Sequence, residues 1–264
     1  MVETSARKGS TLRTLGVSLA ICLGCSLLVS AATVWLRPIR DEHRRVARNA
    51  RLAEILGRQP GLVELLGDLA TATLEERVVD LRTGAFAPEV DPAGFDPVVA
   101  AAVPATSQAI SAERDLARIQ RQALRGVVTL VRRDGAPQAI ILPFYGQGYA
   151  SIIRGSIALA ADGNTIIGLL ISEHGETPGI GSEITEEEWG ALWPGKKVRD
   201  ADGRLRIHVV AEEATPPPDD EAFHVDCISG ATRSTEGVGQ MVRFWLGDDG
   251  FGPFLARVRE GALR

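Results

Sequence analysis

The stretch GVVTLVRRDGAPQAIILP, residues 126–143, decides the fold, because it places the pair Asp-Gly at 134–135 between two apolar, β-branched runs. Asp-Gly is a preferred two-residue hairpin turn, so the two runs are predicted to pair as antiparallel strands. The pattern recurs in SIALAADGNTIIGLLI, residues 156–171, around Asp-Gly at 162–163, and a third Asp-Gly at 202–203 precedes RLRIHVV. Three such turns between β-rich runs predict a mostly antiparallel sheet.

Helices are predicted to flank this sheet. Residues 77–84 are predicted to form a further strand. Residues 85–107, which contain four prolines, are predicted to form an extended loop. A short helix is expected after Thr185, which would cap it ahead of three glutamates. A longer helix near the C-terminus should end at Gly247, and its apolar residues have the spacing of one buried face: Val238, Met241, Val242, Trp245 and Leu246. The fold class is therefore α+β.

The N-terminal part departs from this pattern. Residues 15–36 form a run of 22 residues without a charge, and a helix of that length spans roughly 33 Å, enough to cross the hydrocarbon core of a membrane. A cleaved signal peptide has a shorter apolar stretch, so an uncleaved single-span anchor is favoured. The chain is divided into a tail (1–14), a transmembrane helix (15–36), a stalk helix (37–57) and a soluble domain (58–264) that opens with a short helix at 62–70.

Charge separates a basic N-terminal part from an acidic remainder. Residues 1–51 hold nine Lys and Arg against three acidic residues, a net charge of +6, and since the whole chain carries −5, the remaining 213 residues carry −11. Such an acidic domain does not resemble a nucleic-acid binder. The six arginines between 37 and 51 fit contact with lipid head groups, and by the positive-inside rule they favour a cytoplasmic domain.

The cysteines predict neither a disulfide framework nor a metal centre. Cys22 and Cys25 lie inside the predicted span, and Cys227 is the only cysteine in the soluble part. One chain with so few ligands offers no zinc or iron–sulfur set. We therefore expect no metal site.

Two glycine-bearing loops are candidate ligand sites. EHGETPGIG, residues 173–181, combines three glycines and a proline with the polar groups of His174, Glu176 and Thr177. Its irregular backbone allows close approach to a ligand, although a surface turn is the alternative. LPFYGQGYAS, residues 142–151, places aromatic rings beside glycines, which suits a planar ligand or ordinary packing; its rings are Phe144, Tyr145 and Tyr149.

A third candidate is VDCISGATRSTEGVG, residues 225–239. Small residues favour a tight turn, after which Thr232 presents a hydroxyl shortly before a helix expected to begin near Thr235. The N-terminus of a helix has unpaired N–H groups and positive potential, so it stabilises a phosphate, and Arg233 adds a formal charge. The alternative is that these hydroxyls only cap the helix, a role that we assign to Thr235.

A wider pattern favours the phosphate interpretation. DCISGAT, residues 226–232, matches the signature Asp-x-x-(Ser/Thr)-Gly-Ala-Thr at which flavin transferases attach FMN to threonine through a phosphoester. Together with EHGETPGIG, the run WGALWPGKKV (189–198) and the ending FWLGDDGFGPFL (244–255), it makes nearly the whole chain similar to the C subunits of the Na+-translocating NADH:quinone reductase, the NqrC family.

The resemblance implies a covalent flavoprotein. FMN would be attached to Thr232. The transferase would recognise the residues before it, which are Asp226, Ser229, Gly230 and Ala231. The first glycine loop would line the flavin through His174, Glu176, Thr177 and Gly179. The protein would position the FMN and set its hydrogen bonding and local charge.

The resemblance also implies a partner set and a location. The chain would be one electron-relaying component, incomplete as an enzyme alone, of a bacterial inner-membrane complex that couples electron transfer from NADH to ubiquinone to sodium export. Its soluble domain would lie in the periplasm, against the arginine count. The alternatives are the G-type subunit of an Rnf ferredoxin-linked complex, a membrane-anchored FMN-binding regulatory module, and a flavin-free structural protein in which the motif only caps a helix.

Overall fold

The computed structural model describes residues 15–19, 21–23, 25–26, 72–210 and 220–263. The chain divides into two compact units, Met1–Asn49 and Ala50–Arg264. In the first unit the described residues are helical and exposed. Among the residues described, no helix is long and apolar enough to cross a membrane. The predicted tail (1–14), stalk helix (37–57), helix at 62–70 and most of the span (15–36) lie outside the described residues.

The second unit is built on a five-stranded antiparallel sheet in the order β1-β4-β5-β6-β7. Its strands are β1 (Ala72–Asp80), β4 (Arg125–Arg133), β5 (Ala136–Gln147), β6 (Ile152–Ala160) and β7 (Ile166–Glu173). Two predicted hairpins are confirmed, since β4 pairs with β5 across residues 134–135 and β6 pairs with β7 across residues 162–163. Asp134 and Gly135 have φ angles of 51° and 80°, as a hairpin turn with two left-handed residues requires.

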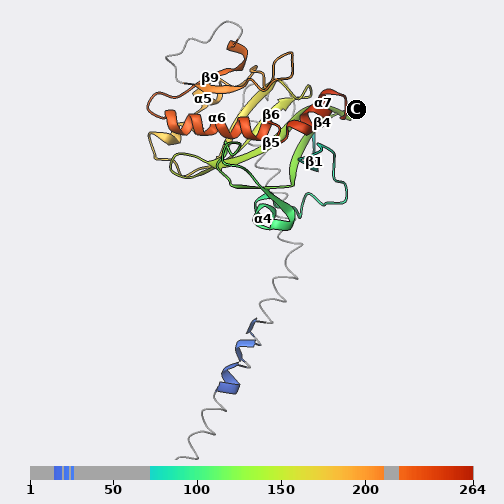
Figure 1. The fold of residues 1–264 in the computed structure, drawn as a ribbon, viewed down its shortest axis with the longest axis vertical. Coiled ribbons are helices and arrows are strands. Elements are labelled where there is room, and N and C mark those ends of the chain that lie inside the picture. Colours follow the sequence, from blue (N-terminus) through green and yellow to red (C-terminus); the bar gives the residue numbers. More distant parts are fainter. Residues whose placement is uncertain (1–14, 20, 24, 27–71, 211–219, 264) are drawn as a thin grey trace, which may run out of the picture. The chain divides into compact units, whose positions relative to one another are not determined.

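Two C-terminal helices, α6 (Thr232–Leu246) and α7 (Gly252–Arg259), complete the main core. Figure 1 shows α6 lying across β5 and β6. Alternate residues of β5 separate the two faces of the sheet: Ile140 and Leu142 join the core shared with α6, whereas Ile141 joins a smaller cluster. The predicted apolar face of α6 is confirmed as buried, and the helix ends before Gly247. Each fully buried aliphatic side chain stabilises the fold by about 1.5–3 kcal/mol.

Smaller elements lie beside the main sheet. β2 (Ser107–Ala109) and β3 (Arg121–Ala123) pair antiparallel, whereas β8 (His208–Val210) and β9 (His224–Asp226), the latter preceded by the 3-10 helix η4 (Glu221–Phe223), pair parallel. The turn at 202–203 produces only an isolated antiparallel bridge between Arg199 and Leu205. The run after this turn contributes β8, which pairs parallel with β9. The prediction that the third Asp-Gly turn belongs to the antiparallel sheet is therefore wrong.

The interpretation of residues 85–107 as an extended loop is also wrong. This stretch contains the helix α4 (Pro97–Ala102) and the 3-10 helix η2 (Pro104–Thr106). The Asp96 carboxylate caps α4 by accepting hydrogen bonds from the backbone N–H groups of Val98 and Val99. Pro97 occupies the first turn, where its missing N–H has no helical partner to lose.

Thr185 does not cap the helix that follows it. It is the last residue of the 3-10 helix η3 (Gly181–Thr185), and its Oγ1 donates to the carbonyl of Ser182 at 2.8 Å. The helix α5 (Glu187–Gly190) begins after Glu186, without a side-chain cap. The hydroxyl is thus used inside a turn that the sequence pattern did not indicate.

The strand expected at 77–84 is β1, which begins earlier, at Ala72, and ends at Asp80 before a turn.

Candidate functional site

The turn before α6 places Thr232 at the first position of the helix. β9 ends at Asp226, and a turn follows in which the N–H of Ala231 donates to the carbonyl of Ile228 at 2.9 Å. Gly230 has a φ of +83°, a left-handed conformation that glycine adopts without strain. Thr232 is half-buried, whereas Ser229 and Gly230 are exposed. The helix therefore begins three residues earlier than the sequence predicted.

Thr235 does not act as the N-cap. It is fully buried, and its Oγ1 donates to the carbonyls of Ala231 at 3.1 Å and Thr232 at 3.0 Å. The residue at the N-cap position, Ala231, has no side-chain group to cap the helix. Within the described part of the chain, the backbone N–H groups of Thr232 and Arg233 have no hydrogen-bond acceptor. The N-terminus of α6 is thus left available to an anion.

A buried carboxylate joins the three candidate segments. Glu176, which is 4% exposed, accepts through Oε2 a hydrogen bond of 2.6 Å from the hydroxyl of Ser234 in the first turn of α6. Its Oε1 accepts from the N–H groups of Ala150 at 3.0 Å and Ser151 at 3.1 Å, and from the Ser151 hydroxyl at 3.3 Å. Glu176 therefore holds the β5–β6 turn and the start of α6 to its own loop.

Hydrogen bonding keeps this carboxylate ionised. Burial acts to raise the pKa of Glu176, but the hydrogen bonds from Ser234, Ala150 and Ser151 outweigh burial and lower the pKa below its ordinary value. A carboxylate that accepts several hydrogen bonds is stabilised in its charged form. Its oxygens are engaged within the protein, so the side chain acts between protein segments.

The rest of the loop from His174 to Gly181 folds around Glu176. The N–H of Glu176 donates to Nδ1 of His174 at 3.3 Å, and the N–H of Gly175 donates to the Ser151 hydroxyl at 2.7 Å. A Cβ at Gly181 would lie 2.6 Å from the Ser234 hydroxyl, so only glycine fits there. Thr177, Pro178 and Gly179 are exposed, which leaves the tip of the loop accessible.

Of the three aromatic residues in the second loop, Tyr149 is the one whose side chain is exposed. Phe144 is 1% exposed and belongs to the core. Tyr145 packs on Trp245 with ring centroids 4.9 Å apart, and burial raises the pKa of its hydroxyl to about 12. Tyr149 is 58% exposed, and the guanidinium of Arg233 lies 5.2 Å from its ring centroid. That contact places Tyr149 beside the start of α6.

Comparison with known proteins identifies the family. Residues 148–247 match the family model of the FMN-binding domain. The chain is 40% identical over 261 residues to the C subunit of the Na(+)-translocating NADH-quinone reductase of Pseudomonas aeruginosa, with 97% of this chain and 99% of that protein covered. The protein of the same name from Pasteurella multocida is 38% identical, with 97% of each chain covered. The chain belongs to this family, NqrC.

The solved structures agree with this assignment. The crystal structure of Shewanella oneidensis NqrC matches with a TM-score of 0.65 at 34% identity, covering 72% of this chain and 85% of that one. A crystal structure of the corresponding reductase subunit from Parabacteroides distasonis matches with a TM-score of 0.53 at 28% identity, covering 69% and 77%. The family predicted from the sequence is thus confirmed, as is an α+β FMN-binding domain with an antiparallel sheet.

The part of this NqrC-family chain that matches the FMN-binding domain contains all three segments that Glu176 connects. The turn at 148–151, the loop at 174–181 and the motif at 226–232 each lie within residues 148–247. The sequence indicated these segments separately but did not show that Glu176 connects them. Ser234 escaped the sequence analysis, and its only signal was its position two residues after Thr232.

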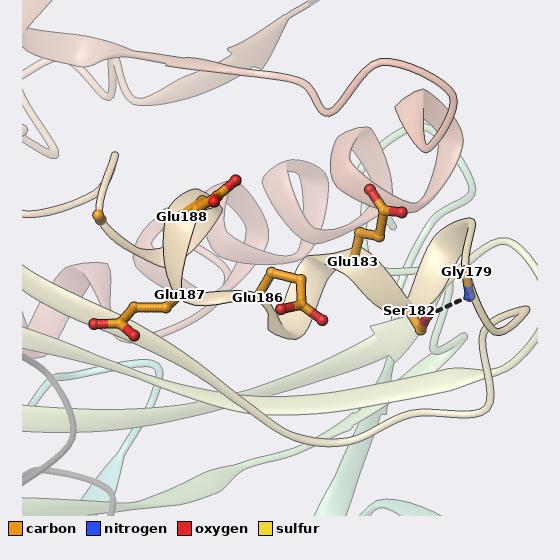
Figure 2. A pocket seen from close by; sticks show the side chains of 7 residues that line it. Gly179, Ser182, Glu183, Glu186, Glu187 and Glu188 are labelled. Atoms are coloured by element: carbon orange, nitrogen blue, oxygen red, sulfur yellow. Dashed lines mark hydrogen bonds between the residues drawn. The ribbon is translucent and has the colours of Figure 1, made fainter.

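A cleft of about 750 Å³ adjoins the loop but is lined by acidic side chains. Its walls are Gly179, Ser182, Glu183, Glu186, Glu187, Glu188 and Ala191. Figure 2 shows the glutamates spread along the segment that runs from η3 to α5, and Ser182 accepting the hydrogen bond of the Gly179 N–H. A phosphate would meet like charges in this cleft, so the N-terminus of α6 is the better anion site. Among the described residues, no group of three or more His, Cys, Asp or Glu is arranged to hold a metal ion.

Proposed function

We propose that this chain relays electrons within a Na+-translocating NADH–quinone reductase through FMN attached to Thr232 by a phosphoester. The observation that carries the proposal is the position of Thr232. It is the first residue of α6, where its own backbone N–H and that of Arg233 have no acceptor among the described residues, and Glu176 joins this segment to the two glycine loops.

The residues present fit a flavin phosphate. The N–H groups of Thr232 and Arg233 and the positive end of the helix favour a negatively charged group, and the exposed Arg233 guanidinium adds a cation. A Cβ built at Gly179 or Gly230 would meet no atom within 4 Å. The described residues therefore leave the outer side of the turn and of the loop tip unobstructed at these two positions.

The same surface offers a platform for an aromatic ring. Tyr149 and Ile180 are 58% and 53% exposed, and they belong to the two loops that Glu176 fixes beside α6. Exposed apolar side chains beside flexible backbone suit a planar ring. We assign the ring contacts to these two residues and the polar contacts to His174, Thr177 and Gly179, with Glu176 holding the loops in place. FMN, when bound, supplies the one- and two-electron chemistry.

Attachment requires an activated donor and a recognition sequence. Thr232 Oγ1 would attack the FMN phosphorus of a flavin dinucleotide; the pyrophosphate bond breaks, AMP leaves and the hydroxyl proton is released. We assign recognition by the flavin transferase to Asp226, Ser229, Gly230 and Ala231. Ser229 and Gly230 are exposed, so an enzyme can reach them, whereas Ala231 is buried and its small size lets the turn close.

We further propose that residues 15–36 anchor the chain in the bacterial inner membrane, with residues 37–57 as a stalk and residues 58–264 as a periplasmic domain. The partners are the other subunits of the reductase, between which this chain would pass electrons toward quinone. A covalent tether keeps an exposed flavin from dissociating between electron transfers. Lipid contacts are assigned to the arginines after the span.

A denaturing gel tests the proposal. The full-length chain, produced with its transferase, should give a band with yellow-green flavin fluorescence, because an ester survives unfolding. Thr232→Leu should give none, and Thr235→Val, which removes the neighbouring hydroxyl, should keep it. A dark wild-type band, or fluorescence that persists in Thr232→Leu, would overturn the attachment.

A further inference from the structure

A buried histidine holds an exposed carboxylate just ahead of the attachment turn. His224 and Asp226 lie two residues apart on β9, so their side chains are on the same face of the strand. Nε2 of His224 is 2.6 Å from Oδ1 of Asp226. His224 is 5% exposed, whereas the Asp226 side chain is 49% exposed. Because an ionised carboxylate only accepts hydrogen bonds, Nε2 must carry the proton.

The surroundings fix both residues of this pair. The indole N–H of Trp189 donates to the carbonyl of Asp226 at 2.9 Å, and the N–H of Cys227 donates to the carbonyl of Val210 at 2.8 Å. The ring of His208 packs against that of His224 at 5.5 Å with an interplanar angle of 89°. The backbone of Asp226 and the ring of His224 are thus each held by a neighbouring element.

His208 does not share in the interaction with Asp226. Its Nε2 lies 3.1 Å from Oδ2 of Asp220, and its Nδ1 lies 2.7 Å from the carbonyl of Arg206. Both of its nitrogens therefore face partners other than the motif. Of this histidine pair, His224 is the one that is hydrogen-bonded to the motif at 226–232.

One carboxylate oxygen of Asp226 is available to a partner outside the chain. Oδ1 is engaged by His224, but in the part of the chain that the structure describes Oδ2 has no hydrogen bond or ion pair. A free aspartate side chain on the surface samples several rotamers, and fixing it beforehand lowers the entropy cost when a partner binds. An acceptor oxygen held in this way suits a cationic or N–H group of a second protein.

We propose that His224 is a positioning residue for flavin attachment, which orients the Asp226 carboxylate so that Oδ2 is recognised by the flavin transferase. The proposal rests on the proposed attachment of FMN to Thr232. No bond is made or broken at Asp226 or His224; the ester forms at Thr232, as AMP leaves the flavin dinucleotide. The partner is a basic surface group of the transferase.

The rate of flavin loading tests this role. Full-length chain in detergent is incubated with transferase and flavin dinucleotide, and initial rates of in-gel fluorescence are measured against the concentration of the chain. His224→Phe removes the donor that fixes the Asp226 carboxylate and should raise the KM for the chain by about three- to tenfold, the cost of ordering one free side chain on binding, with kcat unchanged. His224→Gln, which retains an N–H donor, should recover most of that loss.

Two further variants separate recognition from folding. Asp226→Asn alters an exposed side chain, so the fold is retained, and it should also raise KM because an N–H group replaces one acceptor. His208→Gln on the neighbouring strand should load with wild-type kinetics. A wild-type KM in His224→Phe or in Asp226→Asn overturns the proposal, as does a loss that appears only in the final extent of loading. A wild-type chain that takes up no flavin overturns the proposed function as well.

Discussion

At the scale of single residues, the buried Glu176 carboxylate contributes to stability through its hydrogen bonds to two other segments. We expect Glu176→Gln to lower the free energy of unfolding by about 2 kcal/mol at pH 7, because an amide N–H would face the donors that one carboxylate oxygen now accepts from. For a domain of this size that is a fall of about 4–8 °C in Tm. Thermal unfolding followed by circular dichroism measures it, and Glu187→Gln on the exposed face of α5 is the control.

The pH dependence of this difference has a defined sign. The pKa of Glu176 is lowered below its ordinary 4.5 in the folded chain. Its stabilisation is therefore fully present above the ordinary value and is lost as pH falls through the lower folded-state pKa. The Tm gap between wild type and Glu176→Gln should shrink between pH 5 and pH 3, on the scale of about 1.4 kcal/mol per unit of pKa difference. A gap that stayed constant or grew over this range would contradict the role given to the carboxylate.

At the scale of elements, the turn from β9 to α6 depends on the left-handed glycine at position 230. Gly230 and Gly203 have similar φ angles, +83° and +80°, and a Cβ would meet no neighbour at either. Alanine at each should therefore cost a similar amount, about 1–2 kcal/mol of backbone strain. Only Gly230→Ala should also slow flavin loading, since only that turn orients Thr232. Equal loading rates in the two variants would count against this interpretation of the turn.

The elements also show what local sequence determines. A tight hairpin turn needs a backbone conformation that Asp-Gly adopts more easily than most residue pairs, so two hairpins were predictable. The apolar spacing of α6 likewise predicted its buried face. Helix starts were not predictable, because Ala231 precedes α6 without a capping group and the Thr185 hydroxyl serves an internal turn. The site itself depends on the contact between Glu176 and Ser234, 58 positions apart, which no local pattern encodes.

At the scale of the whole molecule, the candidate site is fixed by long-range contacts, while its outer face remains open. The loops at 148–151 and 174–181 converge on one buried carboxylate, but Tyr149 and Ile180 stay exposed. A rigid base with an open face suits a redox group that exchanges electrons with other proteins, because the group is held in position and partners can still approach it. The sequence motif indicates Thr232 as the proposed attachment residue, and the tertiary contacts explain how its surroundings are held.

The position of the acidic domain relative to the membrane is the last prediction. Glu113 is exposed in the described structure, Cys227 is buried, and Cys22 and Cys25 lie in the predicted span. In intact cells, Glu113→Cys should therefore react with a membrane-impermeant maleimide above the background of the parent chain if the domain is periplasmic. The six arginines after the span favour the opposite orientation, so the two arguments give different outcomes. Labelling in lysed cells confirms that the new thiol is reactive, and labelling that requires lysis would place the domain in the cytoplasm.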